Sequence, residues 1–175
     1  MKRFTILTAA ILLTAATAFS QQGIWTAGLI TSHFNNFESN QRIDKMDNPH
    51  GYGLVVGYNI LDKAALSVTG EYLNGNIQDQ PGDETSIRTS FSAHIFPVQF
   101  GRFRPYISGG LVYMHQSLKP ENGSDDTDHL FQLRESVGVD IMLIQRVFFN
   151  FDLAAYTDGF GYLGSVNSFG FRYAF

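Results

Sequence analysis

The stretch TSIRTSFSAHI at residues 85–95 alternates between two kinds of side chain. Apolar residues and threonines occupy every second position, and the positions between them are polar or charged. Successive side chains of a β-strand point to opposite faces, so this period of two predicts a strand with one apolar and one polar face. The same alternation recurs at residues 52–60 and 66–72, where helical spacing does not fit.

Along the rest of the chain, the same alternation predicts eight strands separated by turn and loop signals. They are expected at residues 23–34, 51–61, 64–74, 84–96, 105–116, 130–142, 147–157 and 164–175. Long connectors at 35–50, 75–83 and 117–129 alternate with short ones at 62–63 and 144–146. Transmembrane barrels have an even strand number, short turns inside and longer loops outside. We therefore expect an all-β, eight-stranded antiparallel, up-and-down transmembrane barrel.

The first twenty residues contain the three parts of a secretory signal peptide. A basic start at Lys2 and Arg3 precedes an apolar stretch over residues 4–18, and small residues flank Phe19. We predict a signal peptide over residues 1–20, cleaved near Ser20 or less favourably after Ala18, and one barrel domain over residues 21–175. A retained amphipathic or anchoring helix is the alternative.

The composition limits the classes of function. The formal net charge is −4, and −6 without Lys2 and Arg3, which argues against a nucleic-acid partner. The chain has no cysteine, so disulfides do not hold the fold. After Phe19 no apolar run reaches the roughly 20 residues of a membrane helix, whereas a barrel strand needs only about 9 to 11.

The last predicted strand reads SFGFRYAF at residues 168–175 and carries aromatic rings at Phe169, Phe171, Tyr173 and Phe175. This pattern resembles the C-terminal assembly signal of outer-membrane barrels. Residues 21–175 resemble the small outer-membrane barrel superfamily that includes the membrane domain of OmpA, OmpX and OmpW-like proteins. The resemblance implies a monomer in the bacterial outer membrane, in contact with lipid and lipopolysaccharide and recognised by the barrel-assembly machinery. Alternation alone leaves a soluble lipocalin-like barrel open.

Aromatic residues near the predicted strand ends are expected to form girdles at the two membrane surfaces. The two sets are Trp25, Tyr58, Phe96, Phe100, Tyr106, Phe148 and Tyr173 at the periplasmic end, and Phe34, Tyr72, Tyr113, Tyr156 and Tyr162 at the outer end.

If the apolar faces meet lipid, the polar faces meet inside the barrel. The predicted interior network comprises Glu71, Arg88, His94, Arg134, Asp140, Asn150, Asp152 and Arg172. Antiparallel registry predicts Glu71 near Arg88, and Asp152 diagonally near Arg172. Because eight strands leave a lumen that side chains can fill, we expect a plugged interior rather than a pore. Glu135 falls on the lipid face, between Leu133 and Val137. Either the outer rim of the barrel begins near this residue, or a β-bulge shifts the register of the strand there.

Candidate chemistry is sparse. His115 and Ser117 share one strand face, with a spacing similar to that of outer-membrane lipid hydrolases, but Leu118 follows where those enzymes have asparagine. The acidic residues 125–128 could gather Ca²⁺ or Mg²⁺, yet they lack the spacing of an EF-hand. His33, His50 and His129 occur singly, without the helical pairing typical of zinc sites, and are interpreted as surface residues. We predict no cofactor and no metal site.

These observations favour a non-enzymatic barrel with a structural or surface-interaction role, carried by its outward loops. The first alternative is a narrow OmpW-like channel for small molecules, which predicts an apolar pocket or lateral opening in the outer half of the barrel. The remote alternative is lipid hydrolysis by His115 and Ser117.

Overall fold

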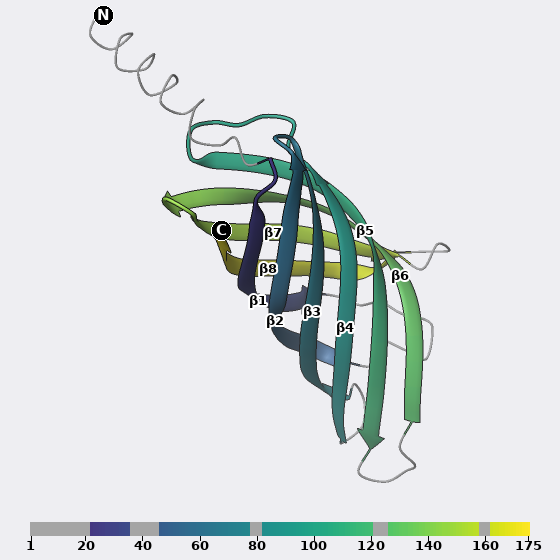
Figure 1. The fold of residues 1–175 in the computed structure, drawn as a ribbon. Coiled ribbons are helices and arrows are strands. Elements are labelled where there is room, and N and C mark those ends of the chain that lie inside the picture. Colours follow the sequence, from purple (N-terminus) through teal and green to yellow (C-terminus); the bar gives the residue numbers. More distant parts are fainter. Residues whose placement is uncertain (1–21, 36–45, 78–81, 121–125, 158–161) are drawn as a thin grey trace, which may run out of the picture.

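The computed structural model describes residues 22–35, 46–77, 82–120, 126–157 and 162–175. The eight strands are β1 (Trp25–Asn35), β2 (Met46–Leu61), β3 (Ala64–Ile77), β4 (Gly82–Ile95), β5 (Phe103–Pro120), β6 (Asp126–Ile144), β7 (Val147–Thr157) and β8 (Tyr162–Ala174). Each strand pairs antiparallel with its neighbours in sequence, and β1 pairs with β8 to close the barrel (Figure 1). The predicted all-β, up-and-down barrel is therefore confirmed.

The predicted signal peptide over residues 1–20 lies outside the described residues and stays a prediction. Among the residues that the structure describes, no helix has the length and apolar character needed to cross a membrane.

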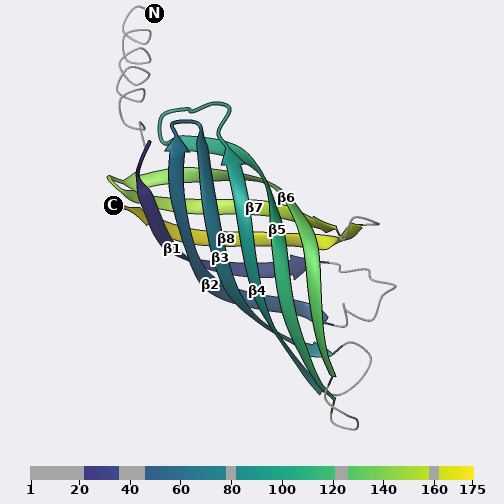
Figure 2. The same cartoon turned by 45° about the vertical axis from the view of Figure 1, so that its right-hand side comes forward.

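The register of the eight pairings fixes the stagger of the barrel. Paired positions followed once round the wall are Trp25, Tyr58, Leu66, Ala93, Gly109, Glu135, Ala155, Ser165 and finally Asn35. The circuit returns to β1 ten residues beyond its start, so the shear of the barrel is ten. With strands about 4.8 Å apart and a rise of about 3.4 Å per residue, this shear tilts the strands by about 40° from the barrel axis. The oblique course of the strands is visible in Figure 2.

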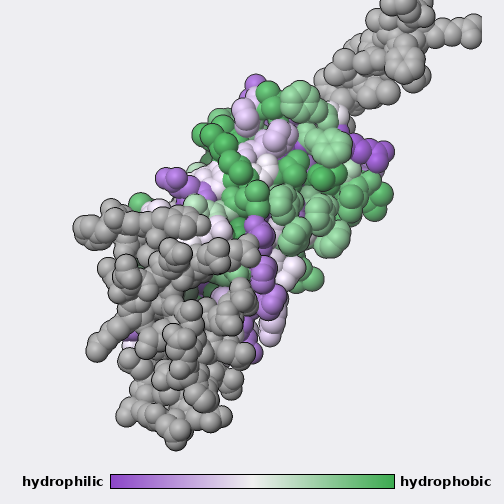
Figure 3. Space-filling model, turned by 180° about the vertical axis from the view of Figure 1, so that it is seen from behind, coloured by the Kyte–Doolittle hydropathy of each residue, from purple (hydrophilic) through white to green (hydrophobic). Residues whose placement is uncertain are grey.

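Side chains alternate between the inside and the outside of the wall as the sequence predicted. In β4, Arg88 and His94 are buried, whereas Ile87, Phe91 and Ile95 are each about half exposed. The exposed apolar residues of all strands together cover the outer wall, and Figure 3 shows hydrophobic side chains gathered over the barrel. Such an outer surface is what a bilayer requires, because lipid chains offer no hydrogen bonds to polar side chains.

Several strands extend farther outward than the sequence predicted. Residues 46–50, 75–77, 117–120 and 126–129 were expected in loops but belong to strands. Their polar composition resembles that of loops, but hairpin hydrogen bonds continue beyond the apolar part of the wall. Figure 1 shows β5 and β6 reaching beyond the ends of β7 and β8. The pairing of β6 with β7 begins only at Leu133, so the outer end of β6 has a described strand partner on β5 alone.

Candidate functional site: the barrel interior

A buried ion pair lies in the outer half of the interior. Glu71 on β3 and Arg88 on β4 are direct register partners, with side chains 5% and 1% exposed. The Arg88 Nε and Nη2 atoms donate to Glu71 Oε2 at 2.9 and 2.6 Å, and the Ser32 hydroxyl donates to Glu71 Oε1. The guanidinium carbon also lies 4.4 Å from the Phe34 ring centroid and 4.8 Å from that of Tyr156. Both charges therefore have partners within the barrel, as buried charges require.

A second polar cluster occupies the middle of the barrel around Asp152 on β7. Its carboxylate accepts hydrogen bonds from Arg134 Nη2, from the Tyr106 hydroxyl at 2.7 Å and from the Ser136 hydroxyl at 2.8 Å. The remaining Arg134 donors reach Ser108 Oγ and the Tyr156 hydroxyl, each at 3.2 Å. Asp152 on β7 thus binds donors from β5 and β6, which ties three neighbouring strands together through the interior.

The predicted pairing of Asp152 with Arg172 is wrong. The register places Asp152 opposite Ser168, which is four residues from Arg172 and beyond the reach of a diagonal pair. Arg172 instead has Asp140 as its carboxylate neighbour, at 3.8 Å. Asp140 also accepts a hydrogen bond from Asn150 Nδ2 at 2.8 Å.

His94 lies lower in the interior, among aromatic rings. Its Nε2 atom is 2.7 Å from the Ser67 hydroxyl, and its ring meets the Tyr106 ring edge-on at a centroid distance of 5.0 Å. The residues predicted to face inward therefore form three connected sets: Glu71 with Arg88; Arg134, Asp152, Asn150, Asp140 and Arg172; and His94 with Ser67.

An apolar layer that the sequence did not predict lies at each end of this polar interior. The outer layer is a buried cluster of Phe34, Leu73, Val112, Met114, Ala154, Tyr156 and Val166. Toward the short turns, Phe148 packs with Ala174, and Phe96 packs with Tyr106 and Ala65. Arg104 on β5 covers this end as well, with its guanidinium carbon 3.5 Å from the Phe96 ring centroid.

These layers correct part of the predicted aromatic girdles. Five members of the predicted set are at most 4% exposed and point inward: Phe34, Phe96, Tyr106, Phe148 and Tyr156. Strand parity was the available signal, since Phe96 follows His94 by two residues and Phe148 precedes Asn150 by two. The outward members include Trp25, Tyr72, Tyr113 and Tyr173, and the side chain of Tyr162 lies outside the described residues.

The family model of the outer membrane protein beta-barrel domain matches residues 5–175. The chain belongs to this family. It is therefore an outer-membrane protein of a bacterium, and its apolar wall faces lipid. Among curated proteins, none matches this sequence.

Solved structures with the same fold include several small outer-membrane barrels. The outer-membrane protein OprG of Pseudomonas aeruginosa superposes with a TM-score of 0.65 at 14% identity, over 89% of this chain and 97% of its own. The N-terminal barrel domain of OprF from the same organism gives 0.59 at 16% identity, over 88% and 98%. Neisserial surface protein A gives 0.58 at 18% identity, over 87% and 96%. At these identities the likeness shows the fold alone.

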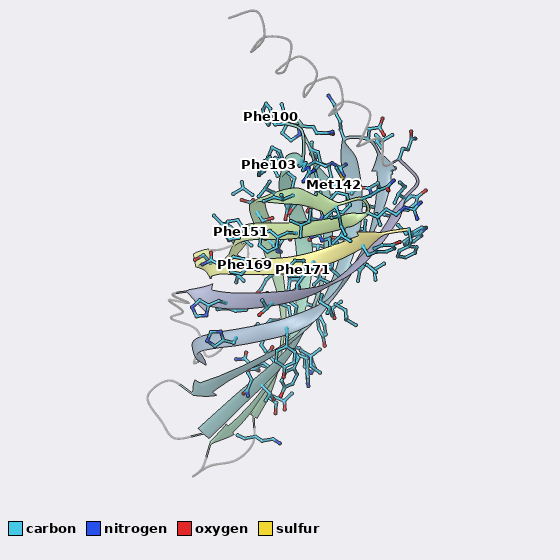
Figure 4. The ribbon with its side chains drawn as sticks, turned by 90° about the vertical axis from the view of Figure 1, so that its left-hand side faces the viewer. Phe100, Phe103, Met142, Phe151, Phe169 and Phe171 are labelled. Carbon is cyan, nitrogen blue, oxygen red and sulfur yellow. The ribbon has the colours of Figure 1, made fainter. Side chains whose placement is uncertain are left out.

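The residues predicted as the assembly signal of this outer-membrane barrel lie on its lipid face. Phe169, Phe171, Tyr173 and Phe175 are between 42% and 62% exposed. Figure 4 shows Phe169 and Phe171 with Phe151 along the wall formed by β7 and β8, and the rings of Phe151 and Phe169 are 5.1 Å apart. Figure 4 also shows Phe100 and Phe103 at the end of the barrel near the connection between β4 and β5.

The two outward residues considered for lipid hydrolysis, His115 and Ser117, both lie on the outer side of β5 near the rim. His115 Nδ1 is 3.4 Å from His129 Nδ1, and within the described part of the chain no hydrogen bond joins His115 to Ser117. Part of the acidic stretch considered for Ca²⁺ or Mg²⁺, including Asp125, lies outside the described residues.

Glu135 lies on the lipid face without any bulge in the register. It pairs directly with Gly109 on β5 and Ala155 on β7, and the exposed residues Leu133 and Phe131 continue the apolar wall beyond it. Neither of the two predicted explanations for this residue applies. The structure instead places a carboxylate within the lipid-facing wall.

Proposed function

We propose that this outer-membrane barrel is closed to solutes and serves a structural or surface-interaction role. The observation that supports this proposal is the filled interior: an apolar layer at each end and a hydrogen-bonded polar centre between them. Two cavities within the described interior measure about 30 and 20 Å³. Each has room for about one water molecule, which is too little for a conducting path.

The same interior gives the barrel its stability. Arg88 and Arg134 are each held by a carboxylate, by hydroxyl groups or by aromatic rings. Opening a path would separate these partners and leave a buried charge uncompensated, which costs about 3 to 5 kcal/mol for a single pair. The polar network replaces the hydrophobic core that a soluble protein of this size would have.

The channel alternative predicted an apolar pocket or lateral opening in the outer half of the barrel. Apolar side chains do gather there, but Leu73, Val112 and Val166 are at most 2% exposed and pack against one another. This packing favours a closed outer end. Conduction remains the outcome that would overturn the proposal.

The projecting sheet supports a role at the cell surface. Beyond the last paired residue of β7, the outer ends of β2 to β6 continue as a paired extension, with polar or charged residues such as Lys119 and Asp128 on β5 and β6. Proteins with this fold include the attachment invasion locus protein of Yersinia pestis, which has also been solved in complex with the heparin analogue sucrose octasulfate. We propose that the extension and the connectors beyond it present the contact surface, and that the barrel is a monomer without enzymatic activity.

The outer wall of the barrel also fits two proposed partners, the lipids of the outer membrane and the barrel-assembly machinery. Its exposed apolar residues suit contact with outer-membrane lipid and lipopolysaccharide. Its C-terminal strand, with Phe169, Phe171, Tyr173 and Phe175 on one face, suits recognition by the barrel-assembly machinery.

Single-channel recording in planar bilayers tests the proposal. The folded protein, checked by its heat-modifiable gel mobility, should give no steady conductance. A double variant, Glu71→Ala with Arg88→Ala, removes two large interior side chains and serves as the control for an opened lumen, so it should conduct. Reproducible single-channel steps from the unmodified protein would overturn the closed barrel and put transport in its place.

A further inference from the structure

Four of the five histidines of the chain lie on the outer face of the barrel in two cross-strand pairs. His33 on β1 is the register partner of His50 on β2, and His115 on β5 is the register partner of His129 on β6. The fifth, His94, is buried in the interior. The pairing depends on strand register, so residues that are isolated in the sequence become neighbours in the fold.

In both pairs the two Nδ1 atoms approach each other. They are 3.2 Å apart between His33 and His50 and 3.4 Å apart between His115 and His129. The ring planes are inclined by 29° and 36°, with centroids 4.5 and 4.7 Å apart. Two N–H groups cannot face each other at this distance, so at least one Nδ1 of each pair offers its lone pair to the space between the rings.

The Nδ1 spacing matches that of two imidazoles bound to one metal ion. Zinc–nitrogen bonds of about 2.0 to 2.1 Å at a tetrahedral angle place the two nitrogens about 3.3 to 3.4 Å apart. In the second pair the Tyr113 hydroxyl is hydrogen-bonded to His129 Nδ1 at 2.7 Å, and this bond would be exchanged for the bond to the ion. The nitrogens are thus already at a suitable spacing, and because the ring planes are inclined by only 29° and 36°, rotation of the side chains is needed to direct both lone pairs at one ion.

We propose that these two histidine pairs are binding sites for a divalent transition-metal ion of the Cu²⁺ or Zn²⁺ class. Neutral imidazole suits these ions, whereas Mg²⁺ and Ca²⁺ prefer oxygen ligands. Within the described part of the chain, no group of three or more histidine, cysteine, aspartate or glutamate side chains forms a closed metal site. Each pair therefore makes an open site, in which water or an external ligand completes the coordination.

The position of the pairs makes them accessible from outside the cell. His50 and His129 are exposed, and His33 and His115 are half-buried. On β1, His33 follows the lipid-facing residues Leu29 and Thr31 toward the outer rim, and on β5, His115 follows Tyr113. A bound ion would join β1 to β2 at one site and β5 to β6, near their outer ends, at the other.

Copper binding to the folded protein in detergent micelles tests the inference. Isothermal titration should give two Cu²⁺ ions per barrel, and the electron paramagnetic resonance spectrum should show nitrogen ligands. His33→Asn and His115→Asn should each leave one site and weaken binding at the altered pair by about tenfold or more. The double variant, His33→Asn with His115→Asn, should retain neither site, and Mg²⁺ should not compete in the unmodified protein.

Matched controls separate the rim pairs from other histidine effects. His94→Asn removes a histidine that is far from the rim and should leave two sites, and Thr85→Ala, an outward rim position, provides a second control if His94→Asn does not fold. Heat-modifiable mobility confirms folding of every variant. Equal Cu²⁺ binding by the double variant and the unmodified protein, or no saturable binding by the unmodified protein, would overturn the inference.

Discussion

Glu135 is the residue least suited to its surroundings. Its outward neighbours along β6 are Leu133 and Val137, and its cross-strand partners Gly109 and Ala155 are too small to cover it. The small residues leave an open groove of about 680 Å³ on the outer wall, with Glu135 in its lining. Within the described part of the chain, Glu135 has no ion-pair or hydrogen-bond partner, so its polar group meets the hydrocarbon side of the wall directly.

Replacing this carboxylate should therefore stabilise the protein. Charged side chains on the lipid face of a barrel are destabilising, and acidic residues less so than the 2 to 4 kcal/mol of arginine or lysine. We expect Glu135→Leu to raise the free energy of unfolding by about 1 to 2 kcal/mol, measured by guanidinium unfolding in phospholipid vesicles. Val137→Leu, a neighbouring apolar exchange, should change it little. An unchanged or lowered stability of Glu135→Leu would show that the carboxylate has a favourable partner in the membrane.

Which residues face inward could be predicted from the sequence, because parity along a strand fixes the face of every side chain once one face is assigned. Arg88 and His94 follow from the alternation in residues 85–95. Partners across strands could not be predicted equally well, because they depend on the register of two strands. The sequence alone therefore predicts Arg172 rather than Arg134 as the partner of Asp152, and it leaves His33, His50 and His129 as isolated surface residues.

At the level of strands, the outer ends of β5 and β6 are the clearest departure from a uniform barrel. These ends pair with each other up to Leu118 and Asp126, although β7 accompanies β6 only from Leu133. The sequence predicted the existence and order of all eight strands. It made β2 to β6 too short at their outer ends. The polar composition of these outer ends is typical of a loop. They are strands because the backbone hydrogen bonds of the hairpin continue through them.

Because the outer ends of β5 and β6 lie beyond the last paired residue of β7, and β4 is their sole further neighbour among the described strands, the barrel should fold without them. Ser117 and Thr127 are register partners, so residues 118–126 can be replaced by an Asn-Gly turn between them. We expect the shortened protein to retain its heat-modifiable gel mobility, with a free energy of unfolding within about 1 kcal/mol of the original. Deleting Gly109 and Gly110 from the membrane part of β5 is the matched control and should prevent closure. A shortened protein that does not fold would show that the extension belongs to the folding unit.

For the molecule as a whole, strand number and shear together determine the size and tilt of the barrel. The number of strands follows from the count of alternating segments in the sequence. The shear does not, because it is the sum of eight registers, and seven of these depend on a turn or loop between two strands. Only the pairing of β1 with β8, which no connector joins, completes the circuit and sets the shear at ten.

The β1–β8 seam allows the shear to be tested by cross-linking, since the chain contains no cysteine of its own. Thr31 and Phe169 are outward register partners across the seam. Direct antiparallel partners have Cα atoms about 4.5 to 5.5 Å apart, which a disulfide spans, whereas a shift of two residues exceeds its reach of about 7 Å. Thr31→Cys with Phe169→Cys should therefore form a disulfide in the folded protein, detected by gel mobility with and without reductant.

Two offset pairs identify the alternatives. Thr31→Cys with Asn167→Cys would be direct partners at a shear of eight, and Thr31→Cys with Phe171→Cys at a shear of twelve. At a shear of ten, both offset pairs should stay reduced under conditions that oxidise the first pair. Efficient cross-linking of either offset pair, with no bond between the first, would contradict the register. It would also move Asp152, Arg134 and Glu71 to different heights relative to the opposite wall, so the cross-link tests the geometry on which the filled interior depends.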